Sequence, residues 1–110
     1  MDFITSYHKF RNSPDGTDSY VELGHDMTTL INEDQQNAVI YFTLRGFAHS
    51  YVLLYEDQAV TTDFAGRAKK EMQTYLDIIL TAFNNISHPE TLWGILNKVI
   101  ITYEHSKKIF

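Results

Sequence analysis

The chain has 110 residues, 44% of them hydrophobic, with no cysteine and a formal net charge of −5. This length predicts one domain, and the apolar content is too high for a chain that is disordered throughout. The absence of cysteine excludes disulfides, thiol catalysis and thiolate zinc sites, and it fits a reducing compartment. We expect a cytoplasmic protein, because residues 1–8 lack a signal-peptide pattern and no stretch has the roughly 20 apolar residues of a membrane span.

The N-terminal part predicts a helix, a turn and two short strands. Helical spacing of apolar side chains over about 2–11 predicts a short helix, and the turn-forming residues at 12–18 predict its end. Residues 19–23 alternate in polarity, which favours a strand. Gly24 is placed in a turn that leads into a second strand at 27–31.

The centre of the chain predicts a β-hairpin over about 38–55. Its two arms, 38–44 and 50–55, are rich in β-branched and aromatic residues, and Gly46 lies between them in the predicted turn. A further short strand is predicted at 59–62. The expected sheet is therefore an antiparallel meander of three to five strands around this hairpin.

Two helices are predicted after the sheet. Asp63 is a candidate N-cap for a long helix at about 64–85, which has a continuous helical repeat of apolar residues. Ser87 and Glu90 have the spacing of a capping box that would open a second helix at about 89–105.

Within that second helix, the β-branched run at 98–104 also fits a strand, but no turn signal separates it from the preceding residues. We therefore expect helix there. Together these elements predict an α+β fold in a single domain over residues 1–110.

Acidic residues are concentrated in the middle of the sequence. Residues 12–66 hold nine acids and one base, Arg45, for a net charge of −8, whereas the flanking residues together carry +3. Such a surface favours a cationic partner and disfavours wrong ones. Two loop pairs would lie at the same end of the predicted hairpin and form a partner-binding patch: Glu33, Asp34, Glu56 and Asp57.

Three tyrosines of the hairpin, Tyr41, Tyr51 and Tyr55, are predicted to extend this patch. Tyrosine is enriched at binding hot spots because it offers apolar area and a hydroxyl group. The alternative is that these rings belong to the core, and burial distinguishes the two.

Catalytic and metal-binding signatures are absent from the sequence. No two of the five histidines have the i, i+4 spacing of a metal-binding pair, and no nucleotide-binding loop, hydrolase elbow or zincin motif occurs. We expect no cofactor and no metal. The only pairs with potential for acid–base chemistry are His25 with Asp26 and His49 with Tyr51.

A short match to a nucleic-acid motif starts at Arg45. The segment Arg45-Gly46-Phe47-Ala48 resembles the first four positions of the RNA-recognition-motif sheet signature, but His49 stands where the stacking aromatic belongs. The surrounding negative charge would repel phosphate. We therefore expect no nucleic-acid partner, and no membrane partner either.

These observations favour a small acidic protein-binding module that neutralises or regulates a basic partner. Immunity proteins, antitoxins and phage-type inhibitors act in this way, and a nuclease toxin is a plausible target because its phosphate-binding site attracts carboxylates. The alternative is a homo-oligomeric structural or regulatory domain, such as a homodimer. A second alternative is a small enzyme that uses His49 or His25.

Overall fold

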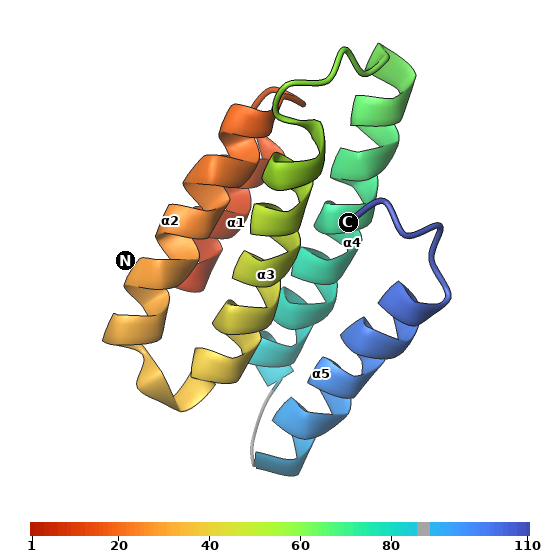
Figure 1. The fold of residues 1–110 in the computed structure, drawn as a ribbon. Coiled ribbons are helices and arrows are strands. Elements are labelled where there is room, and N and C mark those ends of the chain that lie inside the picture. Colours follow the sequence, from red (N-terminus) through yellow and green to blue (C-terminus); the bar gives the residue numbers. More distant parts are fainter. Residues whose placement is uncertain (86–88) are drawn as a thin grey trace.

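The computed structural model describes residues 1–85 and 89–110, and the side chains of 1–85 and 93–110. The helical elements follow in this order: α1 (Phe3–Arg11), α2 (Thr17–Glu33), the 3-10 turn η1 (Gln35–Asn37), α3 (Ala38–Tyr55), α4 (Thr62–Asn85) and α5 (Pro89–Glu104). They form an elongated bundle of 44 × 29 × 21 Å (Figure 1). The described residues contain no strand, so the predicted α+β fold with a β-meander is wrong.

The two strands predicted at 19–23 and 27–31 are parts of the continuous helix α2. Polarity alternates over only five residues there, whereas the helical repeat extends over the whole element. Its buried apolar residues lie three or four positions apart: Tyr20, Leu23, Met27 and Leu30. Gly24 lies inside the helix and makes no turn.

The predicted hairpin over 38–55 is the single helix α3. Its β-branched residues favour a strand locally, but β propensity depends strongly on context. A helix gathers one set of side chains on the side that packs against α2 and α4: Ile40, Tyr41, Leu44, Ala48 and Tyr51. Gly46 has no positive φ and continues the helix.

The N-terminal helix confirms the prediction over about 2–11. Asp2 caps α1, because its carboxylate accepts a hydrogen bond from the backbone N–H of Thr5 at 3.0 Å. The basic residues in the last turn suit the negative end of the helix dipole.

The long helix predicted at about 64–85 is confirmed as α4, but its cap differs from the prediction. Thr61 accepts a hydrogen bond from the backbone N–H of Phe64 at 3.0 Å, while Asp63 lies within the first turn and pairs with Arg67. The strand predicted at 59–62 does not form, since α4 already begins at Thr62.

The helix predicted at about 89–105 is confirmed as α5, and residues 98–104 are helical. Tyr103 and Val99 pack on the core, so the β-branched run contributes one side of a helix. The proposed capping box at Ser87 and Glu90 lies outside the residues whose side chains are described.

After α5 the chain turns back and inserts its last two residues into the bundle. Lys108 takes a left-handed φ of 56°, which redirects the backbone. Two tyrosine hydroxyls then hold the segment: Tyr55 donates to the carbonyl of Ile109 at 2.9 Å, and Tyr103 donates to the carbonyl of Phe110 at 2.8 Å. Ile109 and Phe110 are buried as a result.

The ring of Phe110 joins three other helices. Its centroid lies 5.7–6.4 Å from those of four aromatic rings: Tyr20 of α2, Phe47 and Tyr51 of α3, and Tyr75 of α4. Edge-to-face and tilted pairs at such separations are favourable beyond the area they bury. The terminal segment is therefore part of the core.

This arrangement predicts a large effect of Phe110→Ala on stability. Removing a buried phenylalanine side chain leaves a cavity, and we expect the free energy of unfolding to fall by about 3 kcal/mol in urea titrations. Ile101→Ala is the matched control, because Ile101 is 59% exposed on α5; its effect should stay within about 0.5 kcal/mol. Equal stability of the two variants would show that the terminal segment is not packed.

Candidate functional site

The four acids of the predicted patch lie at opposite ends of α3. Glu33 and Asp34 precede this helix, whereas Glu56 and Asp57 follow it. An 18-residue helix is about 27 Å long at 1.5 Å per residue. The reasoning that placed the two pairs at the same end depended on the hairpin and is therefore wrong.

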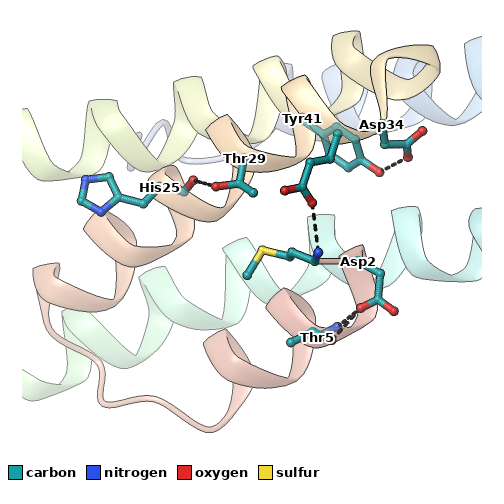
Figure 2. Close-up of polar contacts among 8 residues, drawn as sticks. Asp2, Thr5, His25, Thr29, Asp34 and Tyr41 are labelled. Atoms are coloured by element: carbon teal, nitrogen blue, oxygen red, sulfur yellow. Dashed lines mark hydrogen bonds and ion pairs between the residues drawn. The ribbon is translucent and has the colours of Figure 1, made fainter.

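Two of these acids have structural partners within the chain. Asp34 accepts a hydrogen bond from the hydroxyl of Tyr41 at 2.6 Å (Figure 2). It also accepts one from the side-chain amide of Asn37 at 2.8 Å, where α2 meets η1. Glu33 pairs with the amino group of Met1 at 3.0 Å and raises the pKa of that amine. Glu56 and Asp57 are exposed.

The three predicted tyrosines contribute to the core. Tyr41 and Tyr51 are each 1% exposed. Burial raises the pKa of both phenols, and at Tyr41 the hydrogen bond to Asp34 raises it further. Tyr55 is half-buried and uses its hydroxyl to hold the terminal segment. Their positions therefore agree with the alternative interpretation, in which these rings belong to the core.

Both candidate catalytic histidines line one shallow surface cavity of about 220 Å³ between α2 and α3. Arg45 crosses this cavity and donates to the hydroxyl of Thr28 at 3.2 Å. Within the described residues, neither imidazole ring is hydrogen-bonded, and the contact of His25 in Figure 2 is made by its backbone oxygen to Thr29. The acid–base geometry required by the enzyme hypothesis is thus not formed at His25 or His49.

A second hollow, between α1 and α2, brings charged and hydroxyl side chains together. We call it the α1–α2 groove; its volume is about 200 Å³. Its polar lining comes from both helices and the connection between them: Ser6, Lys9, Ser13, Asp18, Ser19, Glu22 and Asp26. The three carboxylates and one ammonium give the groove a net charge of −2.

Asp26 lies deepest among the charged groups, with 6% of its surface exposed. One carboxylate oxygen accepts from the ammonium of Lys9 at 3.0 Å, and Glu22 lies 3.4 Å from the same ammonium. These contacts raise the pKa of Lys9, mainly through the hydrogen bond to Asp26. The stabilisation that corresponds to this raised pKa is present at neutral pH and is lost as the pH rises through the pKa of Lys9.

Two buried polar atoms of the groove lack a hydrogen-bond partner among the described residues. They are the second carboxylate oxygen of Asp26 and the hydroxyl of Ser6. Buried polar atoms are nearly always satisfied in native structures, because an unpaired one loses its hydration without compensation. The groove therefore has unused capacity to accept hydrogen bonds.

No protein family model matches this chain, and no curated protein or solved structure matches it either. Across residues 1–85 and 89–110, the helices are too short or too polar to cross a membrane. In the same residues, no three or more histidine or carboxylate side chains are placed so that they could hold a metal ion together. A functional conclusion therefore depends on the chain's own surfaces.

The sequence prediction missed the α1–α2 groove because it assigned α2 to strands. Asp18, Glu22 and Asp26 are four residues apart, so they share one side of a helix but would not be grouped by two strands joined by a turn. The sequence signal that could have revealed these three acids is the helical repeat of apolar residues in α2, which starts at Tyr20.

The groove geometry predicts that Lys9→Met destabilises the protein. The methionine keeps an apolar stem but leaves the buried Asp26 carboxylate without any partner. Since Lys9 is itself partly exposed, we expect a loss of about 1–2 kcal/mol in the free energy of unfolding, measured with urea.

Two further variants test the cause of this loss. Arg67→Met removes an exposed partner of Asp63 and should change stability by less than about 0.5 kcal/mol. Lys9→Met combined with Asp26→Leu should recover the loss, because an apolar pair can replace a buried ion pair. A Lys9→Met variant as stable as Arg67→Met would contradict the buried-carboxylate explanation.

Proposed function

We propose that the protein is a binding module for a basic protein partner, and that the α1–α2 groove accepts a cationic side chain of that partner. The observation that carries this proposal is Asp26, a nine-tenths buried carboxylate in a groove of net charge −2, with one oxygen that has no hydrogen-bond partner among the described residues. This proposal assigns partner binding to the α1–α2 groove rather than to the ends of α3.

A guanidinium group fits the unused acceptors of the groove. It carries five N–H donors in a planar fork and pairs with carboxylates in a bidentate manner. Lys9 now supplies one cation to Asp26 and Glu22, and its side chain is 45% exposed. An incoming arginine could displace the Lys9 ammonium toward solvent and reach Asp26 and the hydroxyl of Ser6.

The wider charge distribution supports a basic partner. The stretch with nine acids and one base, residues 12–66, comprises α2, α3, their flanking connections and the start of α4. A field of this sign speeds the encounter with a cationic surface and raises specificity. In this proposal the chain acts in the cytoplasm as an immunity protein, antitoxin or phage-type inhibitor, and a nuclease toxin offers the cationic phosphate-binding site that such an inhibitor covers.

An NMR titration with a capped arginine tests this proposal. N-acetyl-arginine amide should shift the backbone amide signals of Ser6, Ser19 and Asp26 in a saturable way. N-acetyl-citrulline amide, which has the same shape without the charge, should leave them unchanged. Combined Asp18→Asn and Glu22→Gln substitutions should weaken arginine binding about fivefold, since two exposed carboxylates are neutralised.

The matched control neutralises the originally predicted pair at the end of α3. Combined Glu56→Gln and Asp57→Asn substitutions change the net charge equally but lie outside the groove. They should leave arginine binding unchanged. Equal weakening by both double variants would show nonspecific attraction and overturn the groove as the binding site, as would equal shifts with citrulline or no shifts with arginine.

A further inference from the structure

The outward side of α3 is apolar although no helix of the described chain covers it. Figure 1 shows α3 at the front of the bundle, between α2 and α4. Val39 is 53% exposed, Phe42 62% and Leu53 69%. Together with Gly46 and His49, these residues form a single stripe, which we call the α3 seam.

The spacing within the seam is that of a helix–helix interface. Its five members follow one another at steps of three, four, three and four residues: Val39, Phe42, Gly46, His49 and Leu53. Apolar residues repeated in this way form the contact line of two packed helices. The core residues of α3 lie on the opposite side, so this helix is apolar on two sides, which is typical of a helix covered on both.

Gly46 lies at the centre of the seam, and within the described residues neither its backbone conformation nor its packing requires a glycine. It has no positive φ, and a Cβ atom added there would meet nothing within 4 Å. Glycine inside a helix destabilises it relative to alanine, and it is typically found where another backbone approaches closely. We therefore expect the backbone that approaches Gly46 to belong to another molecule.

We propose that the α3 seam is the interface of a homodimer in which α3 packs antiparallel to α3 of a second copy, with Gly46 on the two-fold axis. The seam is self-complementary in this arrangement. Val39 and Leu53 are each seven residues from Gly46 and face one another across the interface, while Phe42 meets His49. Every contact away from the axis is thus made twice, as a two-fold interface requires.

Charge favours a second copy over the basic partner as the occupant of the seam. Residues 35–55 contain no acid and a single base, Arg45, in a chain of net charge −5. Two acidic chains can approach along this neutral side with little repulsion, whereas a basic protein is attracted to the acids elsewhere. The guanidinium of Arg45 already lies 5.3 Å from the centre of the Phe42 ring, and this cation–π contact strengthens when solvent is excluded.

Sedimentation equilibrium over a range of micromolar concentrations tests the dimer. The native chain should approach twice its monomer mass of 12.8 kDa. Gly46→Ala should raise the dissociation constant about tenfold or more by blocking close approach, yet leave the monomer Tm unchanged or higher because alanine favours the helix. A monomeric native chain at every concentration overturns the proposal, and so does unaltered association of Gly46→Ala.

Charged substitutions locate the interface. Phe42→Glu should abolish association, because it places a carboxylate in the apolar seam. Ile101→Glu is the matched control, since Ile101 is 59% exposed on α5 and lies outside the seam. It should associate like the native chain, and loss of the dimer with Ile101→Glu but not with Phe42→Glu would place the interface elsewhere.

Disulfide trapping tests the antiparallel register, because the chain has no cysteine of its own. Mixed Val39→Cys and Leu53→Cys chains should form a cross-linked heterodimer on oxidation. Val39→Cys chains alone should not cross-link, since in this register their cysteines lie about 21 Å apart along the helix axis. The reverse pattern would overturn the antiparallel dimer.

Discussion

Burial of the Phe110 ring is the contact that connects the segment after α5 with α2, α3 and α4. The Phe110 ring contacts aromatic side chains of α2, α3 and α4. The hydroxyl of Tyr103, in α5, donates a hydrogen bond to the backbone carbonyl of Phe110. The last helix makes few contacts with the rest of the bundle except through α4 and this segment. The returning terminal residues therefore connect α5 to the core, and the tyrosines that looked like surface residues supply the rings and hydroxyls that receive them.

The consequence for function is a separation of two surfaces. On one side, α1 and α2 form a groove with the buried charge of Asp26, one oxygen of which has no partner in the part of the chain that the structure describes. On another, α3 presents a neutral apolar seam centred on Gly46. Electrostatic attraction acts at the first and hydrophobic burial at the second. The proposed basic partner and the proposed second copy therefore bind to different surfaces by different interactions.

The sequence predicted the helices correctly where a helical repeat of apolar residues was not accompanied by signals for strands or turns. The helices over 3–11, 62–85 and 89–104 each have a helical repeat, and turn-forming residues separate them from their neighbours. The prediction was wrong over 19–55, where Gly24 and Gly46 were interpreted as turn residues and β-branched residues as parts of strands. The prediction that the two acidic pairs lie at the same end was wrong for the same reason, since it depended on a hairpin that is an 18-residue helix.

By itself, the sequence determined the acidic charge, the absence of thiol chemistry, and three of the five helices, because composition and long periodic repeats are properties of the chain alone. Only the tertiary structure decided that α2 and α3 are helices and which of their side chains stay exposed. Short apolar segments fit either a strand or a helix, and the choice depends on which surface they bury. Packing against Tyr75, Met72 and Phe110 decides it in favour of the helix.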